Sequence, residues 1–347
     1  MSRLFSPFTL RGVSLRNRVV MPPMCMYSAD EDGLATDWHL AHYGARAVGG
    51  VGLIVIEATA VEPRGRITVN DLGLWDDQQI EPLARIARLA HAGGARVGVQ
   101  LAHAGRKAFT PGRGVGPQLP VAPSALPYDE DWVRPQALGT AEIDGVVAAF
   151  RAAAQRAAQA GLDVVEIHSA HGFLLHQFLS PLSNRRDDEY GGTLENRSRA
   201  LLRVVEAVRA VWPDDRPLLV RLSATDWAEG GLTPEDTVEI ARLLKGRGAD
   251  LIDCSSGGLL PAGPPRLGPG YQVPFAEKVR REAAIPTLAV GLITTPELAE
   301  EIVFNGRADL VALGRELLRN PYWPLHAASA LHEDVTWPVQ YERAKRF

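Results

Sequence analysis

The stretch AEIDGVVAAFRAAAQRAAQAGLDVVEIHSAHGF, residues 141–173, contains one complete helix–strand unit. Apolar residues recur every three or four positions over Ala141–Ala160, which indicates an amphipathic helix. Gly161 follows, where a left-handed residue commonly ends a helix. The apolar run Asp163–His168 then predicts a buried strand, and polar residues come directly after it. This stretch therefore predicts an α/β fold, with polar chemistry at the end of the strand.

Seven further runs of strand length lie along the chain, and most of them are rich in Val, Ile and Leu. These runs are Arg18–Met21, Gly52–Ala58, Arg96–Leu101, Pro217–Leu222, Asp250–Ser255, Pro286–Gly291 and Asp309–Gly314. Helical patterns such as Glu195–Trp212 separate them, and Thr233 and Thr295 each precede Pro-Glu, as helix N-caps do. The alternation predicts a (β/α)8 TIM barrel. The competing open sheet is disfavoured because no G-x-G-x-x-G follows the first strand.

The chain has 347 residues, which exceeds the about 250 residues of a typical barrel. We expect one barrel domain over residues 1–347, with the excess in additions. Residues 105–139 hold six prolines and five glycines, too long a stretch for a plain connection. Because this insertion follows the third strand, we expect a partly ordered lid over the barrel mouth. Residues 335–347 form a C-terminal segment beyond the last barrel helix.

Composition excludes several classes of protein. With 37 basic and 41 acidic residues the formal charge is −4, which excludes a strongly basic nucleic-acid binder. Two cysteines cannot build a disulfide scaffold, an all-cysteine zinc site or a cysteine-ligated iron–sulfur cluster. No apolar run is long enough to span a membrane, and residues 1–11 lack the apolar core of a signal peptide. We therefore expect a cytoplasmic protein whose partners are small molecules.

Active sites of such barrels form where the strands end. Gly291 and Gly314 end the last two strands, and Arg315 follows directly. Glycine lets backbone N–H groups approach a phosphate, and arginine offers two parallel donors. These three residues predict a phosphate site, although tight turns alone would also use the two glycines.

Three polar residues end the fourth and fifth strands. His168 and His171 suit a structural pair, two ligands of a metal ion, or two donors to a ligand oxygen, and the residues alone leave these three open. Arg221 ends an apolar strand, where a charge is rarely left without a partner. It either pairs with a core carboxylate, such as Glu166 or Asp253, or holds an anionic or electron-rich ligand.

The strand-end residues, taken in order, resemble the old yellow enzyme family of FMN-dependent ene-reductases, and within it the thermophilic-like class. The resemblance covers essentially the whole chain. The blocks that carry it are Leu4-Phe5-Ser6-Pro7, Asn17-Arg18, Pro23-Met24-Cys25-Met26-Tyr27, residues 100–107 (QLAHAGRK), residues 180–192 (SPLSNRRDDEYGG) and Gln340-Tyr341-Glu342-Arg343.

The resemblance implies a place for FMN. The residues implied around the isoalloxazine ring are Pro22, Pro23, Met24, Cys25, Ala58, Gln100 and Arg221. Gly291, Gly314 and Arg315 are implied at the phosphate, as the barrel argument independently indicates. Arg221 would favour the reduced, anionic flavin. Cys25 would tune the flavin potential, although a buried cysteine is also often inert.

The resemblance also implies a reaction. NADPH or NADH reduces FMN, whose N5 passes hydride to the β-carbon of an α,β-unsaturated carbonyl or nitro compound. His168 and His171 would hold the substrate oxygen, and Tyr27 would also reach the substrate. Arg343 would enter the active site of a neighbouring subunit, in a homodimer or a homotetramer.

One residue departs from the family pattern. Position 173 is phenylalanine where the family usually has a tyrosine that gives the proton, so Tyr27 or a water is expected to donate instead. A flavin-binding barrel with little alkene turnover, such as a sensor, is therefore the alternative function. Dienoyl-CoA-type reductases are excluded because they carry a cysteine cluster and further domains.

Overall fold

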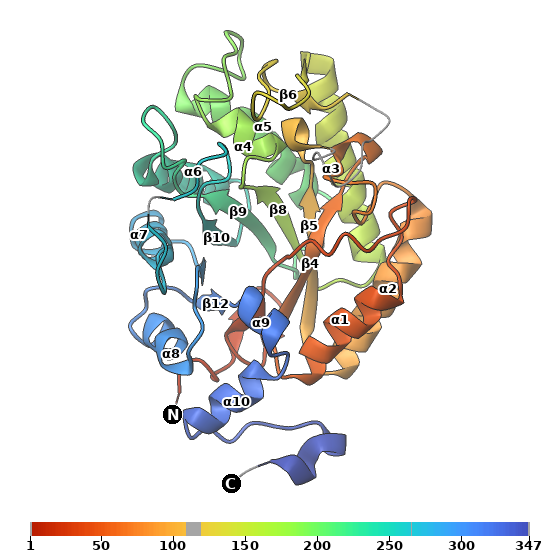
Figure 1. The fold of residues 1–347 in the computed structure, drawn as a ribbon, viewed down its shortest axis with the longest axis vertical. Helices are drawn as coiled ribbons and strands as arrows, with labels where there is room; N and C mark the ends of the chain where they lie inside the picture. Colours follow the sequence, from red (N-terminus) through yellow and green to blue (C-terminus); the bar gives the residue numbers. More distant parts are fainter. Residues whose placement is uncertain (1, 109–118, 265, 346–347) are drawn as a thin grey trace.

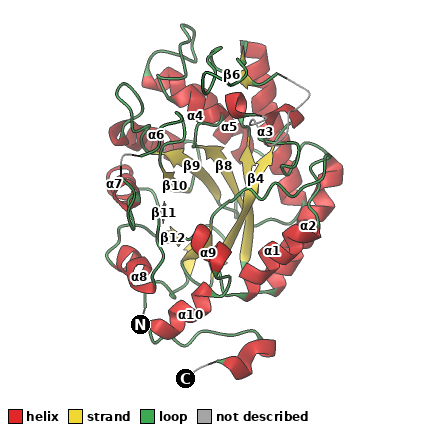
Figure 2. Ribbon diagram, viewed as in Figure 1, coloured by secondary structure: helices red, strands yellow, loops and turns green. Residues whose placement is uncertain are grey.

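The computed structural model describes residues 2–108, 119–264 and 266–345. Eight parallel strands close into a barrel, and a ring of helices surrounds it (Figures 1 and 2). The barrel strands are β3 (Val19–Met21), β4 (Leu53–Ala60), β5 (Arg96–Ala102), β8 (Val164–Ser169), β9 (Leu218–Ser223), β10 (Leu251–Ser255), β11 (Thr287–Val290) and β12 (Leu310–Ala312). Each of them coincides with a predicted run to within two residues at either end. The predicted (β/α)8 barrel is confirmed.

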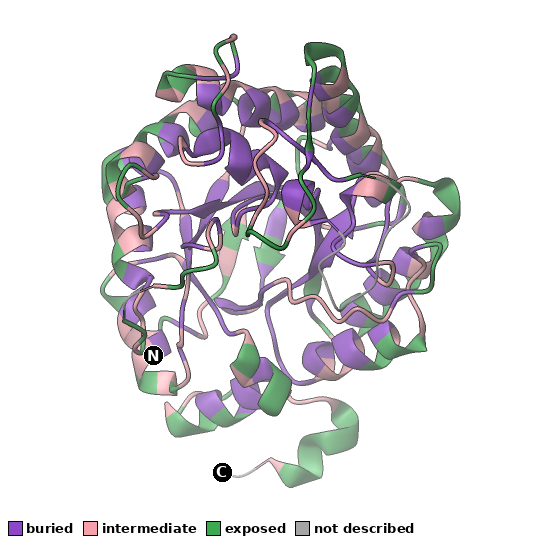
Figure 3. Cartoon of the chain, turned by 45° about the horizontal axis from the view of Figure 1, so that its top comes forward, coloured by how far each residue is buried: buried purple, intermediate pink, exposed green. Residues whose placement is uncertain are grey.

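The helices also follow the sequence pattern. The longer helices are α1 (Asp37–Val48), α2 (Ile80–Ala92), α3 (Thr140–Gln159), α5 (Leu194–Arg209), α6 (Pro234–Gly246), α7 (Val273–Ala283), α8 (Pro296–Phe304) and α10 (Trp323–Ala330), and the short ones are α4 (Leu174–Leu179) and α9 (Arg315–Arg319). The Thr233 and Thr295 side chains accept backbone N–H bonds at the start of α6 and α8, as predicted. Figure 3 shows buried residues on the barrel strands and on the inner faces of the helices.

A hairpin closes the floor of the barrel, and the sequence did not predict it. Its strands are β1 (Phe8–Leu10) and β2 (Val13–Leu15), which pair antiparallel. Val13 and Leu15 are buried against the apolar filling of the barrel. A polar residue interrupts each strand, in FTL and in VSL, so neither stands out as a continuous apolar run like those of the barrel.

The insertion after β5 is partly described. Its first residues form a short 3-10 helix, η3 (Gly105–Lys107), and β6 (Val121–Ala122) pairs in parallel with β7 (Gln136–Ala137). The expected lid includes residues 109–118, which lie outside the described residues. Arg106, after the end of β5, donates to the carbonyl of Pro127, so the described part of the insertion is tied to the C-terminal end of the barrel. Within the described residues, none of the helices combines the length and apolar character that crossing a bilayer requires.

Candidate active site

A polar layer lies inside the barrel, on top of its apolar filling. Val164 of β8 belongs to that filling, and Glu166 and His168 follow on the same face at two-residue steps. The same alternation on β9 and β10 places Arg221 and Asp253 on the inner face. All four polar residues are buried. The layer therefore brings one cation, two acids and a histidine to the C-terminal end of the barrel.

The contacts within this layer are specific. Arg221 Nε lies 3.0 Å from Asp253 Oδ2, and Gln100 Nε2 donates to Glu166 Oε1 at 2.8 Å. The ion pair predicted as one alternative for Arg221 is therefore present, with Asp253 as the partner. Only Nε is engaged, because the two terminal Nη groups make no hydrogen bond with a described residue. Arg221 thus keeps donors available for a ligand.

The two histidines approach each other directly above this layer. Their ring centroids are 5.2 Å apart, with the rings nearly perpendicular. The Ala170 N–H points to His168 Nδ1 at 3.3 Å, which leaves the ring proton on Nε2. Burial first, and then the charge of Arg221, lowers the pKa of both histidines well below the usual value. Both rings are therefore neutral hydrogen-bond donors.

The metal alternative finds no support in the described part of the chain. No cluster of three or more His, Cys, Asp or Glu side chains with a geometry for a metal ion occurs there. His171 Nε2 instead lies 2.7 Å from the Ser255 hydroxyl. Of the three alternatives for the pair, two donors to a ligand oxygen fit the site best.

The loops after β8 and β10 touch where His171 is held. His171 and Gly172 have positive φ values of 59° and 74°. A Cβ on Gly172 would lie 2.3 Å from the Gly258 carbonyl oxygen, so this close approach requires glycine. Lys107 Nζ donates to the carbonyls of His171 and Gly258 at 2.9 and 3.0 Å. Lys107 therefore ties the two loops together.

Further residues that the sequence analysis did not single out position His171. The Ser223 hydroxyl accepts from the His171 N–H at 2.9 Å. His176 Nδ1 accepts from the Gly172 N–H, and its Nε2 lies 3.0 Å from Asp226 in a fully buried pair. Ser223 was visible as the polar end of β9, but the other contacts depend on loop geometry that strand periodicity does not reveal.

The segment after β3 is held by Glu57, a residue of the neighbouring strand β4. The Glu57 carboxylate accepts the Met26 N–H, and it also forms a buried pair with His39 at 3.0 Å. Tyr27 has a positive φ of 53°, a strained conformation for a residue with a bulky side chain. Burial raises the pKa of the Cys25 thiol well above its usual value, so this thiol stays protonated. A nucleophilic role for Cys25 is therefore not supported.

A small apolar cluster lies beside the histidines. Cys25 and Tyr27 pack against a group that includes Ile67 and Phe173. The Phe173 ring is 4.7 Å from the His168 ring, centroid to centroid. The structure thus brings Cys25, Tyr27 and the histidines to one place, with an apolar ring at position 173.

The predicted phosphate residues line a common cavity of about 210 Å³. Gly291, Gly314 and Arg315 all contribute to it. Gly291 has a φ of 125°, and a Cβ there would come within 3.1 Å of Gln272 Nε2. This position therefore favours glycine for its conformation, and a Cβ would also crowd the side chains of Tyr271 and Gln272.

The remaining residues expected around the ring come from β3, β4 and β5. A Cβ on Gly314 would lie 3.5 Å from Met24 Sδ and 3.8 Å from Pro22, so these two border the cavity residues, and Pro23 joins them along the chain. Ala58 and Gln100 are partners in the β4–β5 register, next to an irregularity between Ile56 and Ala58.

Arg343 is the one predicted site residue that lies apart. It is exposed, on the 3-10 helix η4 (Val339–Ala344), in which no residue is buried. In Figure 1 this segment extends beyond α10, on the side of the molecule away from the β8 and β9 labels. The structure therefore does not bring Arg343 to the site of its own chain.

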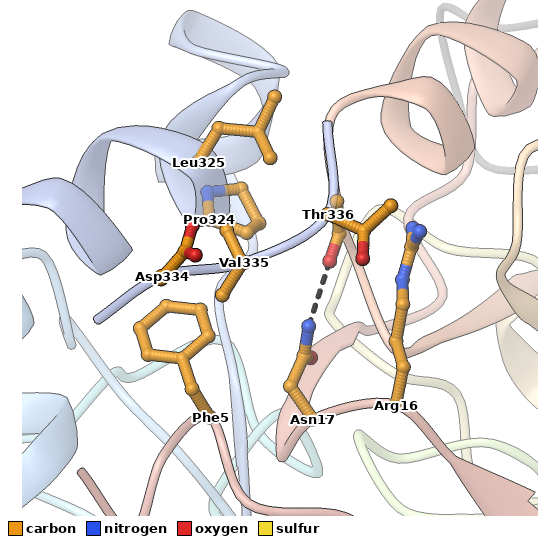
Figure 4. A pocket seen from close by; sticks show the side chains of 9 residues that line it. Phe5, Arg16, Asn17, Pro324, Leu325, Asp334, Val335 and Thr336 are labelled. Carbon is orange, nitrogen blue, oxygen red and sulfur yellow. Dashed lines mark hydrogen bonds between the residues drawn. The ribbon is translucent and has the colours of Figure 1, made fainter. Parts of the chain in front are cut away.

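A second cavity, of about 230 Å³, lies where the C-terminal segment leaves the barrel (Figure 4). Its lining includes Phe5, Arg16, Asn17 and Val335. The Arg16 guanidinium donates to three backbone carbonyls, and Asn17 Nδ2 donates to the Gly50 carbonyl at 2.8 Å. Because these polar groups already have partners, this cavity is structural and the histidine site remains the candidate.

Several known proteins are similar to this chain over nearly its whole length. The NADH:flavin oxidoreductase / NADH oxidase family matches residues 3–334. An NADPH dehydrogenase of Geobacillus thermodenitrificans is 55% identical over 347 residues, which cover 99% of each chain. A solved morphinone reductase has a TM-score of 0.81 at 32% identity, covering 97% of this chain and 91% of its own. The old yellow enzyme homologue of Zymomonas mobilis has a TM-score of 0.80 at 28% identity, covering 97% and 94%.

Proposed function

The chain belongs to the NADH:flavin oxidoreductase / NADH oxidase family, and from this premise we propose that it is an ene-reductase for activated alkenes. The coarser statement needs no proposal: the protein is an FMN-dependent NAD(P)H oxidoreductase, and the resemblance to old yellow enzymes is confirmed. The proposal concerns the second substrate, an α,β-unsaturated carbonyl or nitro compound, and the residues that bind it.

The residues at the mouth fit FMN. Arg221 is a buried cation whose Nη groups are not engaged by described residues, which suits the electron-rich pyrimidine edge of a reduced flavin. The cavity at Gly291, Gly314 and Arg315 suits its phosphate. Gln100 would hold the ring edge from β5. When bound, FMN supplies a centre that takes up a hydride from NADPH and gives one to a substrate.

The chain's own residues then bind and polarise the alkene. His168 Nε2–H and a ring N–H of His171 would donate to the substrate oxygen. Where the Ser255 hydroxyl donates to His171 Nε2, 2.7 Å away, and not to Gln272 Oε1 at 3.4 Å, the ring proton of His171 lies on Nδ1 for the substrate. Negative charge builds on this oxygen as the β-carbon is reduced, and two fixed neutral donors stabilise it more than they stabilise the uncharged alkene.

The observation that carries the proposal is the pair of buried, neutral histidines beside Arg221, whose Nη groups are not engaged by described residues. The charge of Arg221, the register partner of His168, would oppose a metal ion at this place, and a surface histidine would not be buried. The test is an oxygen-free incubation of the purified protein with NADPH and 2-cyclohexenone. We expect one cyclohexanone for each NADPH consumed, measured by gas chromatography. NADPH loss without a saturated product would favour the flavin-binding barrel with little alkene turnover.

Phe173 should limit the protonation step. Phenylalanine has no proton to give, so the α-carbon must be protonated by Tyr27 or by a water. We expect Phe173→Tyr to speed reoxidation of the reduced enzyme by 2-cyclohexenone about tenfold, a modest share of what general acids contribute. Reduction by NADPH should not change. Stopped-flow absorbance separates the two half-reactions, with the exposed Phe304→Tyr as control. If neither half-reaction changes, Phe173 does not limit protonation.

The C-terminal segment is proposed to serve a neighbouring subunit. Val339 is 81% exposed, and no residue of η4 is buried. The segment therefore makes little contact with its own barrel. A second copy that covered the exposed side chains of Val339 and Tyr341 would remove apolar surface from water. We expect a homodimer, or a tetramer of two dimers, in which Arg343 completes the partner's pocket.

Arg343→Ala should raise the KM for the alkene about tenfold, the effect of losing one charge-assisted hydrogen bond. The oligomeric mass, measured by light scattering, should stay the same. Mixed dimers provide the sharper test. An Arg343→Ala subunit keeps intact histidines, and a His168→Ala/His171→Ala subunit keeps an intact Arg343. If the arginine acts on its neighbour, co-expression of the two restores activity at one of two sites. No restoration would show that it does not.

A further inference from the structure

Two buried acids in the polar layer have had no role so far. Glu166 on β8 and Asp253 on β10 are both fully inaccessible to solvent. Strand β9 runs between those two strands, and Asp253 is the register partner of Arg221. The acids therefore flank the arginine that is proposed to face the flavin.

The charges in this layer do not balance if both acids are ionised. Arg221 supplies one positive charge, and its Nε contacts Asp253 at 3.0 Å. Glu166 Oε1 receives one neutral N–H, from Gln100. Glu166 Oε2 and both carboxylate oxygens of Asp253 are buried without a hydrogen-bond donor among the described residues, although Oδ2 contacts Arg221 Nε as an ion pair. Two carboxylates would thus leave one negative charge uncompensated in a water-free interior, which is costly.

The two acids also contact each other. A hydrogen bond between the two carboxyls raises the pKa of Glu166 and lowers that of Asp253, and such a bond needs one proton. Burial, followed by the negative charge of Asp253, raises the pKa of Glu166 to about 8. Burial likewise raises the pKa of Asp253. With a pKa of about 8, Glu166 keeps its proton at neutral pH, and the neighbouring His168 is neutral and adds no charge.

We propose that Glu166 and Asp253 share a single proton, so that the pair carries one negative charge and balances Arg221. Both are positioning residues that act through Arg221 and Gln100. A proton between the carboxyls gives a hydrogen bond to oxygens that otherwise lack a donor. The flavin then faces Arg221, whose positive charge is offset by one negative charge and not by two. The arginine therefore still stabilises the negative charge of the reduced flavin. This last consequence rests on the proposed place of FMN, whereas the shared proton does not.

An infrared spectrum of the protein as purified tests the shared proton directly. We expect the carbonyl band of a protonated carboxylic acid at neutral pH, and we expect Glu166→Gln to remove it. This substitution keeps the shape of the side chain and the single negative charge, so the fold should be retained. Glu62→Gln is the matched control. Burial opposes ionisation of Glu62, but contacts with His103 and Arg64 lower its pKa to about 2, so no acid band should be lost. An unchanged spectrum for Glu166→Gln would overturn the proposal.

The midpoint potential of the bound flavin tests the charge count. Glu166→Gln leaves Asp253 ionised, and Asp253→Asn leaves Glu166 free to take the charge, so neither single variant should shift the potential. The double variant removes the charge and should shift the potential to more positive values. If each single variant already shifts the potential, both acids are ionised and the proposal is wrong. A double variant without a shift would also contradict it.

The two measurements keep this inference apart from the proposed function. The infrared band concerns only the acids, so it persists whether or not the protein reduces alkenes. Loss of the band together with normal alkene reduction would overturn the shared proton alone. A band that is present in a protein without alkene reduction would support the shared proton and count against the ene-reductase.

Discussion

Alkene reduction should fall about 100-fold or more when His168 and His171 are both replaced by alanine, because removal of even one donor to a developing oxyanion typically costs that much. Both histidines are buried and neutral, and the ring of His171 is held by Ser255. Water that enters the site in their place would be a less well-oriented donor. The loss should therefore lie in the rate of reoxidation by the alkene.

The measurement is anaerobic stopped-flow absorbance of the reduced His168→Ala/His171→Ala variant mixed with 2-cyclohexenone. FMN content should equal that of the wild type, because the residues proposed for the phosphate and the ring are elsewhere. His326→Ala, an exposed histidine on α10, is the matched control and should behave like the wild type. A variant that is reoxidised at the wild-type rate would refute the role of the pair.

Arg221→Met should reduce both stability and FMN retention. Removing one partner of a buried ion pair costs about 3–5 kcal/mol, since Asp253 would be left without its cation. Loss of a charge-assisted bond to the flavin should weaken FMN binding by about 10- to 100-fold. Arg88→Met is the control, because Arg88 is an exposed residue whose pair with Glu81 lies on the surface.

The stability loss should also depend on pH. Arg221 opposes the rise in the pKa of Glu166 and Asp253, so its removal raises both folded-state pKa values further. In the folded wild type Glu166 keeps its proton up to about pH 8, and in the variant it keeps it to a higher pH. The deficit in unfolding free energy should therefore widen as the pH rises through about 8. Urea unfolding below and above this pH measures it. A deficit that stays constant would mean that the acids near Arg221 do not titrate there.

The barrel and much of the site could be predicted because both follow from strand period. Inner and outer residues alternate along a strand, and parallel strands end together, so the ends of eight runs suffice to locate a mouth. Gly291, Gly314 and Arg315 line one cavity for this reason. For Arg221 the sequence left open a pair with a core carboxylate or a contact with a ligand. Its Nε pairs with Asp253, and its terminal donors stay available for a ligand.

The contacts that hold the site could not be predicted in this way. Lys107 bridges the carbonyls of His171 and Gly258, and the second of these lies 151 residues from Lys107 along the chain. Periodicity does not reveal such loop contacts. Ser223 and Ser255 were visible only as polar strand ends. Their contacts depend on the left-handed backbone conformation of His171. The sequence does not signal this conformation, because it is usually glycine that marks such a turn. The proton shared by two acids is likewise a property of the folded interior.

The central claim is that reduced flavin in this site passes its hydride to an activated alkene. The most direct measurement follows the flavin absorbance without oxygen through two additions. NADPH should first bleach the yellow protein, and 2-cyclohexenone should then restore the colour with formation of cyclohexanone. Bleaching that is not reversed by cyclohexenone, a maleimide or a nitroalkene would contradict the ene-reductase, and a colourless protein that FMN does not reconstitute would contradict the cofactor site itself.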